Sequence, residues 1–248
     1  HRFHNYPVIF ESFSSQKKEV CLAQAKDLLS RKFNGEMGID IFYGNYSAYD
    51  NTEGNLPLSD DLLRTIELKT TVLVALHDFV DSPHGYGNML FADFFEWIRF
   101  LDEYSKTLDF FWLLKPHPNS TNEHLTYVID LCNRNSNFKL IDKGLNNSQL
   151  AKLRIDLCLT MYGTIGYEFA YLGVKVLTGC PNTPYGAYNF TQAAKTLDEY
   201  RLLISQVDRK VNSNLTIINK KEIREYYYMH YIYNVSSWIV RDFTRYFS

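Results

Sequence analysis

Residues 71–76 read Thr71-Val72-Leu73-Val74-Ala75-Leu76, and the fold assignment depends on this run. Its apolar residues do not alternate with polar ones, which is typical of a strand buried on both faces in a parallel sheet. An amphipathic stretch from Met89 to Thr107 predicts a helix, and Phe110-Phe111-Trp112-Leu113-Leu114 predicts a second buried strand. A strand, a helix and a strand in this order indicate a βα unit with parallel strands.

The same alternation continues toward the carboxyl end. It predicts helices at 122–133, 148–153 and 163–172 and strands at 138–141, 155–160 and 174–178. Gly173 closes the last of these helices, because glycine readily adopts the positive φ of a helix C-terminus. We therefore predict an α/β fold, a Rossmann-like parallel sheet with helices on both faces, and we assign it to residues 70–248.

The two flanks lack this alternation. We interpret residues 1–69 as a linker or the remnant of a preceding domain, with one helix from Lys17 to Arg31 and an aperiodic stretch from Asn34 to Asp60. The tail from Lys220 to Phe247 has a helical pattern and is rich in Tyr and Trp. We expect this aromatic carboxy-terminal helix to pack on a neighbouring domain rather than to bind a cofactor.

Composition and charge exclude several classes of partner. The 248 residues carry 26 basic and 28 acidic side chains mixed along the chain, so nothing resembles the basic surface that binds nucleic acid. The four cysteines show no short metal-binding spacing, which indicates a reducing compartment. The chain begins without Met, and it contains neither an apolar membrane-spanning run nor the core of a signal peptide. We expect a cytoplasmic protein without a bound cofactor, and we expect this chain to be an internal segment of a longer one.

The loop after the first strand holds a group of potential ligands. His77, Asp78, Asp81 and His84 lie close together in the sequence. Such a set can bind a divalent cation, or it can form a turn in which the Asp side chains bond their own backbone. A third interpretation, in which His77 or Asp78 contacts a sugar or an acceptor without metal, is favoured over the metal site, and the self-satisfied turn stays open. These two residues are also the candidates for catalysis.

Lys115-Pro116-His117-Pro118 follows the second strand, at the edge where open parallel sheets bind their ligands. The two prolines restrict the backbone around His117 and hold its imidazole on an extended turn. An imidazole can donate to a phosphoryl oxygen, and Lys115 adds a positive charge. We predict that both residues contact phosphate, and the alternative is a plain turn with a solvent-facing histidine.

The turn Tyr162-Gly163-Thr164-Ile165-Gly166 follows the fourth strand and begins a helix. Its glycines allow a ligand to approach the backbone, Thr164 supplies a hydroxyl, and a helix N-terminus favours an anion. Glu168 is either a first-turn carboxylate that favours the helix dipole or an acceptor for ribose hydroxyls. The spacing matches neither a dinucleotide fingerprint nor a P-loop. The predicted nucleotide-binding or phosphate-binding residues here are Tyr162, Gly163, Thr164, Gly166 and Glu168.

The stretch from Gly179 to Tyr188 follows the fifth strand, and its Pro and Gly content predicts a long loop. Loops at this edge often cover a ligand, so Tyr185 and Asn189 are candidate lid or sugar contacts. An ordinary structural loop fits the same residues. No Gly-x-Ser-x-Gly elbow or activated cysteine identifies a catalytic nucleophile.

Lys115-Pro116-His117-Pro118 and Gly163-Thr164-Ile165-Gly166-Tyr167-Glu168, with Gly173 and Val176 after them, resemble the carboxy-terminal nucleotide-binding half of a GT-B glycosyltransferase. The resemblance covers about residues 70–200 and is closest to capsule and surface-polysaccharide biosynthesis proteins, among them the Kdo transferases. It implies that His117, Thr164 and neighbouring amides touch the phosphate of a cytidine nucleotide sugar such as CMP-Kdo.

The same resemblance implies a glycan acceptor as second partner and peripheral association with assembly machinery at the inner face of the membrane. In this family the acceptor and usually the catalytic base belong to an amino-terminal domain, and residues 1–69 are too short to supply it. Two alternatives stay open. One is an epimerase of the UDP-GlcNAc 2-epimerase type, which has the same architecture, and the other is a noncatalytic scaffold module of a polysaccharide-assembly complex.

Overall fold

The computed structural model of the protein describes residues 2–36, 39, 49, 57–83, 85–210 and 218–233. In these residues six parallel strands form one sheet with the order β3-β2-β1-β4-β5-β6. The strands are β1 (Thr70–Ala75), β2 (Phe110–Lys115), β3 (Phe138–Leu140), β4 (Leu157–Thr160), β5 (Val176–Thr178) and β6 (Gln192–Ala193). The chain moves outward from β1 to β3 and then returns to the other side of β1 with β4. β1 and β4 therefore flank the switch point, where sheets of this kind bind ligands.

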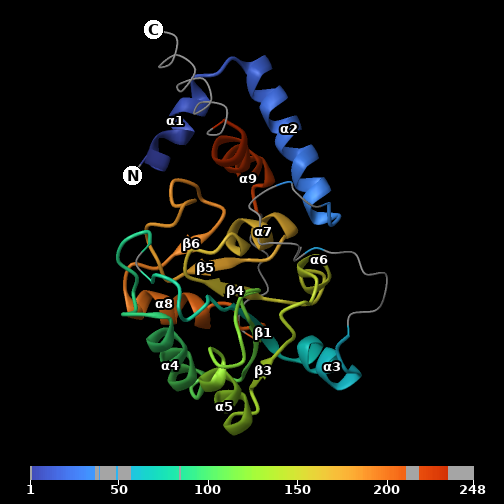
Figure 1. Ribbon diagram of the computed structural model, residues 1–248, viewed down its shortest axis with the longest axis vertical. Coiled ribbons are helices and arrows are strands. Elements are labelled where there is room, and N and C mark those ends of the chain that lie inside the picture. The colour runs from blue at the N-terminus through green and yellow to red at the C-terminus, as the bar shows by residue number, and fades with distance from the viewer. Residues whose placement is uncertain are drawn as a thin grey trace.

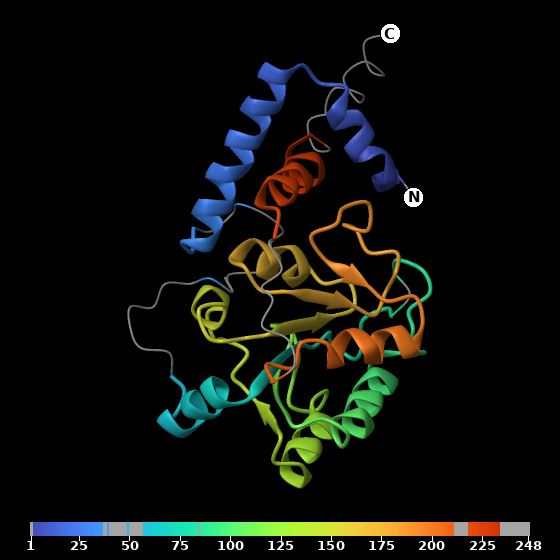
Figure 2. The same cartoon turned by 180° about the vertical axis from the view of Figure 1, so that it is seen from behind.

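Helices cover both faces of the sheet. One face carries α4 (Phe94–Ser105), α5 (Thr126–Arg134) and α8 (Leu197–Ser205). The other carries α2 (Ser15–Phe33), α3 (Asp60–Leu68), α6 (Asn147–Leu150), α7 (Ile165–Leu172) and α9 (Lys220–Tyr227). Figures 1 and 2 show α4 and α5 toward the bottom of the molecule, α8 below β5, and α2, α7 and α9 above β5. The sheet is thus enclosed between two helical layers.

Successive residues of β1 enter two separate cores. Val72 and Val74 belong to the cluster that contains Trp97 of α4, whereas Leu73 belongs to the cluster that contains Tyr167 of α7. All five side chains are fully buried. Because both faces of the strand are covered, its sequence is apolar at every position rather than at every second one.

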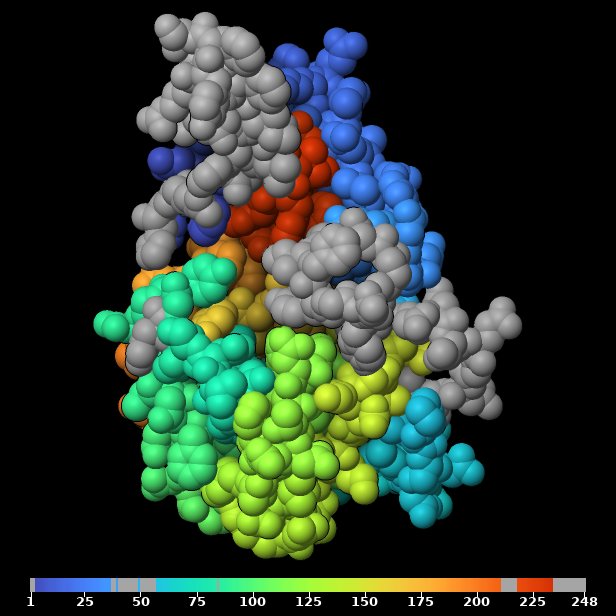
Figure 3. Space-filling view, in the orientation of Figure 1, coloured from blue at the N-terminus to red at the C-terminus, as the bar shows by residue number. Residues whose placement is uncertain are grey.

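The two ends of the described chain pack together. A 3-10 turn (Arg2–Asn5) and α1 (Tyr6–Glu11) precede α2, and a π-helical segment (Tyr228–Tyr233) continues α9. Phe10 of α1, Cys21 of α2 and Met229 form a third buried cluster. In Figure 3 the surface of α9 lies beside that of α2. The first and last helices thus form one layer above α7.

The structure confirms the predicted α/β class, the parallel sheet covered on both faces and the aromatic carboxy-terminal helix, up to Tyr233. The sequence patterns missed α1, α3, α8 and the two-residue strand β6. Two of these helices, α3 and α8, begin at a hydroxyl cap, since Ser59 Oγ accepts the Leu62 N–H (3.3 Å) and Thr196 Oγ1 accepts the Glu199 N–H (3.1 Å). These caps were the available signal.

The predicted boundary at residue 69 stays a prediction. α2, on the amino-terminal side of that boundary, contributes Ala25 and Leu29 to the same core as α7. Most of the aperiodic stretch 34–60, His84 and the tail beyond Tyr233 lie outside the described residues. In the part of the chain that is described, no helix is long and apolar enough to cross a membrane.

Candidate functional site

His77 lies at the switch point, just past the carboxyl end of β1, and it joins this strand to the end of β4. Its Nε2 accepts the Met161 N–H at 3.3 Å, and the Thr160 hydroxyl lies 3.3 Å from the same nitrogen. Thr160 Oγ1 in turn accepts the Gly163 N–H at 3.4 Å. The imidazole therefore fixes the turn from β4 into α7.

The surroundings of His77 keep its ring neutral. The ring stacks on Phe94 with centroids 4.6 Å apart and lies 4.6 Å from the ring of Tyr162. Burial, with a smaller contribution from the nearby His117, lowers the pKa of His77 to about 3. Because Nε2 accepts the Met161 amide, the single proton belongs on Nδ1. These contacts describe a positioning group, and the catalytic assignment of His77 stays a prediction.

His117 lies on the next loop, between Pro116 and Pro118 as the sequence indicates. Its Nδ1 accepts the Asn119 N–H at 3.3 Å, which leaves the proton of the neutral ring on Nε2. Burial lowers the pKa of His117, and the carboxylates of Asp81 and Asp78 oppose that shift. At neutral pH His117 is therefore a neutral donor through Nε2.

The beginning of α7 faces the same region. Thr164 is the N-cap residue, and its hydroxyl makes no capping hydrogen bond. A Cβ atom on Gly163 would lie 3.1 Å from Thr160 Oγ1, a tight contact, and 3.7 Å from His77 Cε1, an ordinary one, so the turn passes close to the imidazole. The helix dipole favours an anion at this end. The structure thus brings together His77, His117, Gly163 and Thr164.

Lys115 differs from its predicted role as a phosphate ligand. Its ammonium group donates to the backbone carbonyls of Lys143 (3.0 Å) and Leu145 (2.8 Å), and the residue is 4% exposed. Burial lowers the pKa of Lys115 to about 8, against the raising effect of Asp142 and Glu168. Lys115 therefore stabilises the loop before α6, and any phosphate contact by this residue stays a prediction.

Glu168 also has partners within the protein. Its Oε1 lies 2.7 Å from Lys32 Nζ of α2, and its Oε2 accepts the Tyr49 hydroxyl at 2.6 Å. Lys32 Nζ additionally contacts the Tyr167 hydroxyl at 2.8 Å. Both oxygens of Glu168 are thus bonded to groups that precede the sheet in sequence, and its predicted contact with ribose stays a prediction.

Tyr185, a candidate lid or sugar contact, is buried, and that role stays a prediction. Its side chain is 0% exposed, its hydroxyl donates to the Gly163 carbonyl at 3.3 Å, and it packs against α7. A Cβ atom on Gly166 would lie 2.6 Å from Tyr185 Cζ, so Gly166 is required by this packing. The sequence could not reveal this contact because the two residues meet only through the tertiary fold.

Asn189 and Tyr162 hold loops in place. The backbone N–H and the side-chain amide of Asn189 both donate to Glu222 Oε1 of α9, at 2.9 and 3.2 Å. The Tyr162 hydroxyl donates to the Ser82 carbonyl at 2.6 Å, which ties the loop after β1 to the loop after β4. Asn189 therefore contacts α9, and ligand contacts by Asn189 and Tyr162 stay predictions.

Sequence reasoning missed His124, which comes from the approach to α5. Its Nδ1 lies 2.9 Å from Asp78 Oδ1, which is within the distance of an ion pair. The geometry of this contact does not make a hydrogen bond, so the buried Nδ1 has no hydrogen-bond partner among the described residues. No local pattern could have linked two residues so far apart in sequence. In the described part of the chain, which omits His84, no group of three or more His, Cys, Asp or Glu side chains is arranged to hold a metal ion.

No protein-family model and no curated protein matches this chain. Two solved structures of Thermosulfurimonas dismutans KpsC are similar to it. The beta Kdo 2,4 transferase is 14% identical with a TM-score of 0.45, covering 87% of this chain and 56% of that one. The beta Kdo 2,7 transferase is 13% identical with a TM-score of 0.46, covering 90% and 59%.

A third similar structure is the UDP-GlcNAc 2-epimerase of Methanocaldococcus jannaschii in complex with UDP-GlcNAc and UDP. It is 16% identical with a TM-score of 0.44, and the match covers 73% of this chain and 49% of that one. The present chain therefore spans about half to three fifths of the length of these structures. Sugar transferases and a nucleotide-sugar epimerase are thus among the proteins to which its structure is similar.

Proposed function

We propose that this chain is the donor-binding part of a glycosyltransferase and binds the phosphate of a nucleotide sugar beside β1 and β4. The observation that carries the proposal is the convergence of the His117 imidazole and the beginning of α7 around His77. These groups come from the loops after three different strands. A site built from several loops at the carboxyl edge of a parallel sheet is typical of ligand binding.

The residues divide the work between direct contact and positioning. His117 donates from Nε2 to a phosphoryl oxygen, and the first amides of α7 donate to the same group. His77 holds the turn that aims those amides, through Thr160 and Met161. The helix dipole adds about 0.3–1 kcal/mol of stabilisation for a phosphate.

In sugar transfer the same groups would stabilise the charge that develops on the departing phosphate. The acceptor hydroxyl must lose a proton in that step, and we propose that a carboxylate takes it. Asp78, which is 5% exposed beside His124, is the candidate within this chain.

The finer part of the proposal is a cytidine nucleotide sugar such as CMP-Kdo, transferred to a surface-polysaccharide acceptor. Its support is the likeness of Lys115-Pro116-His117-Pro118 and the Gly163-to-Glu168 turn to polysaccharide-biosynthesis transferases. We further propose that the protein works in the cytoplasm and associates peripherally with the membrane assembly machinery.

The proposal is tested by titrating the protein with CMP, CDP, UMP, UDP and GDP in thermal-shift and calorimetric experiments. Saturation at about 100 times the dissociation constant is expected to stabilise the fold by roughly 2.7 kcal/mol. Of the five nucleotides, only CMP and CDP should give this stabilisation. A preference for uridine nucleotides would favour the epimerase, and no shift with any nucleotide would contradict donor binding and favour the scaffold alternative.

His117→Ala identifies the site in the same titration. It is expected to weaken nucleotide binding by about 1–3 kcal/mol, because a hydrogen bond to a charged group is lost. The exposed His4, in the turn before α1, provides the control variant His4→Ala, which should leave the affinity unchanged. Equal affinity of the native protein and His117→Ala would remove His117 from the site.

A further inference from the structure

A concave region lies beside the proposed phosphate site, between the beginnings of α4 and α5. It is a pocket of about 380 Å³ lined by Phe79, Asp93, Phe94, Phe95, Glu123, His124, Thr126 and Tyr127. Its volume lies within the range of about 300–1,000 Å³ that is usual for small-molecule sites. The phosphate-binding groups described above do not include any of these lining residues.

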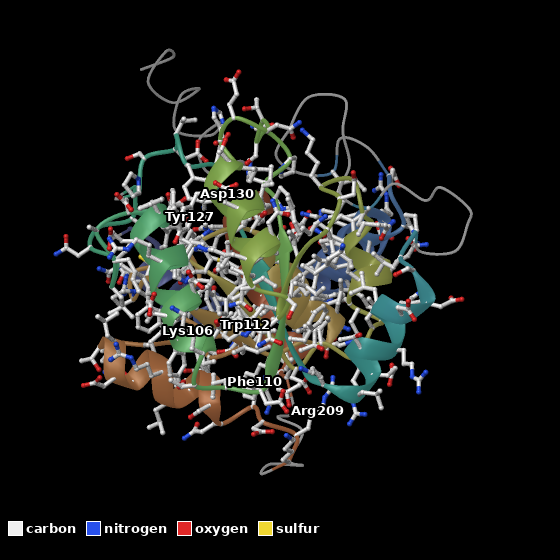
Figure 4. All side chains as sticks on the ribbon, turned by 90° about the horizontal axis from the view of Figure 1, so that it is seen from below. Lys106, Phe110, Trp112, Tyr127, Asp130 and Arg209 are labelled. Carbon is white, nitrogen blue, oxygen red and sulfur yellow. The ribbon has the colours of Figure 1, made fainter. Side chains whose placement is uncertain are left out.

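Aromatic rings form the wall of the pocket. The rings of Phe95 and Tyr127 lie 4.6 Å apart at an angle of 57°. Phe95 is 39% exposed, so its ring is accessible from solvent. Arg134 fixes the opposite edge of Tyr127, since its guanidinium lies 5.3 Å from the ring and contacts the hydroxyl at 3.3 Å. Tyr127 lies between the ribbons of α4 and α5 (Figure 4). The wall is thus an aromatic platform that is held in place.

Two carboxylates border this platform. Asp93 uses Oδ1 to cap α4 by accepting the Glu96 N–H at 2.8 Å. Glu123 is exposed, and no ion pair of its side chain is recorded among the described residues. The eight lining residues include neither Lys nor Arg. The pocket therefore offers hydrogen-bond acceptors and a negative potential, which disfavour an anionic ligand.

The pocket shares a wall with the proposed phosphate site. Phe94 lines the pocket and stacks on His77. His124 also lines it and lies beside Asp78, whose carboxylate acts on the pKa of His117. A ligand in the pocket would therefore lie next to the groups that we propose to hold the donor phosphate.

We infer that this pocket is a subsite for an uncharged pyranose ring of the glycan acceptor. The apolar face of a sugar ring stacks on an aromatic side chain, and its hydroxyl groups donate to carboxylates. The negative potential opposes a sugar acid such as that of the proposed donor, so the acceptor is the partner whose chemistry fits. The acceptor assignment rests on the proposed function, whereas the preference for an uncharged sugar rests on the pocket alone.

The test compares methyl glucoside with methyl glucuronide, which differ in one carboxylate, by NMR titration at low ionic strength. We expect the native protein to bind the glucoside about tenfold more tightly than the glucuronide, because two carboxylates repel the anion. Glu123→Lys should reduce that ratio to about threefold or less. Its control is Glu103→Lys on the exposed surface of α4, which should leave the ratio unchanged.

Tyr127→Ala should weaken glucoside binding about fivefold or more, since the stacking platform is lost. Equal binding of the two glycosides, or an unchanged ratio in Glu123→Lys, would overturn the inference. Failure to detect either glycoside on the native protein would do the same. Glu123 is exposed, so its replacement does not endanger folding.

A parallel titration with CMP and UDP-GlcNAc separates this inference from the proposed function. The pocket variants should leave CMP binding unchanged, as His117→Ala should leave glucoside binding unchanged. Weaker binding of UDP-GlcNAc, but not of UMP, to Tyr127→Ala would assign the pocket to a donor sugar and overturn the acceptor role. Loss of nucleotide binding without loss of glucoside binding would contradict only the proposed function.

Discussion

The amino ends and the carboxyl ends of the parallel strands carry similar polar side chains but use them differently. At the amino ends of the strands, Asp156 and Arg209 form a mostly buried ion pair with a 2.7 Å contact. At the carboxyl ends, the pKa values of His77 and His117 are both lowered. The amino end pairs its charges within the protein, whereas the carboxyl end keeps its imidazole rings neutral. Similar polar side chains are thus charged and ion-paired at one end of the sheet and neutral at the other.

The Arg209 guanidinium makes several further hydrogen bonds at the amino ends of the strands. Its Nη1 donates to the carbonyls of Ile66 and Glu67, both at 3.0 Å, and its other Nη reaches the carbonyl of Arg154. Asp156 completes the network by accepting the Thr71 N–H at 2.7 Å, at the beginning of β1. In Figure 4, Arg209 lies near Phe110, the first residue of β2, at the amino end of that strand.

Arg209→Ala is expected to have the largest effect on stability. Removing one partner of a mostly buried ion pair leaves Asp156 without its cation and costs about 3–5 kcal/mol of unfolding free energy. Urea denaturation of the variant measures this loss. The matched control is Arg99→Ala, whose exposed ion pair with Glu96 should contribute less than about 1 kcal/mol. Equal losses in the two variants would mean that the network around Arg209 stabilises the fold no more than a surface ion pair does.

The carboxyl end should respond to pH instead. His77 has a pKa of about 3 in the folded protein and 6.5 as its ordinary value, so unfolding takes up a proton below pH 6.5. The stability that the neutral ring contributes is present above pH 6.5 and is lost as the pH falls toward 3. Between pH 6.5 and 4.5 this loss amounts to about 2–3 kcal/mol.

His77→Gln tests this pH dependence, because glutamine can accept the Met161 N–H without titrating. The native protein should lose more unfolding free energy than the variant over that interval, as measured by urea denaturation at each pH. His4→Ala, which alters an exposed imidazole, should retain the native slope. Parallel slopes for the native protein and His77→Gln would show that His77 does not cause the acid sensitivity.

The fold could be predicted because its evidence is local in the sequence. The run from Thr71 to Leu76 is apolar at every position, and such a run requires cover on both faces. The order of strands and helices then fixed the class. α3 and α8 were missed because their patterns are short, and their caps at Ser59 and Thr196 were the only strong signals.

The candidate site could be predicted only in part. His117 and the turn at Gly163 follow strand ends, and strand ends of a parallel sheet meet at one edge, so chain order alone brings them together. The partners of Lys115, Glu168 and Tyr185 could not be predicted in this way. Each depends on a residue distant in sequence, such as Lys32 for Glu168, and no periodicity records such a contact.

Gly166→Ala is expected to have an intermediate effect. The added methyl group would overlap the buried ring of Tyr185, and overpacking of this kind costs about 1–3 kcal/mol. The beginning of α7 should shift as well, so nucleotide affinity should fall together with stability. Gly85→Ala is the control, since its Cβ would meet nothing closer than the Ser82 carbonyl at 3.8 Å. Gly166→Ala with native stability would show that Tyr185 can move away, and would remove this contact as a constraint on the site.

Tyr162→Phe should have the smallest effect on stability. It tests whether the loops that follow β1 and β4 depend on one another. Burial raises the pKa of Tyr162 to about 12, so its hydroxyl stays protonated and donates to the Ser82 carbonyl throughout the physiological range. Losing that hydrogen bond should cost about 1 kcal/mol of unfolding free energy. Hydrogen exchange should reveal the change at residues 79–83, with no change at the network around Arg209. Faster exchange at both ends would mean that the sheet transmits the loss, and the separation between its ion-paired end and the end with the neutral imidazoles would then no longer hold.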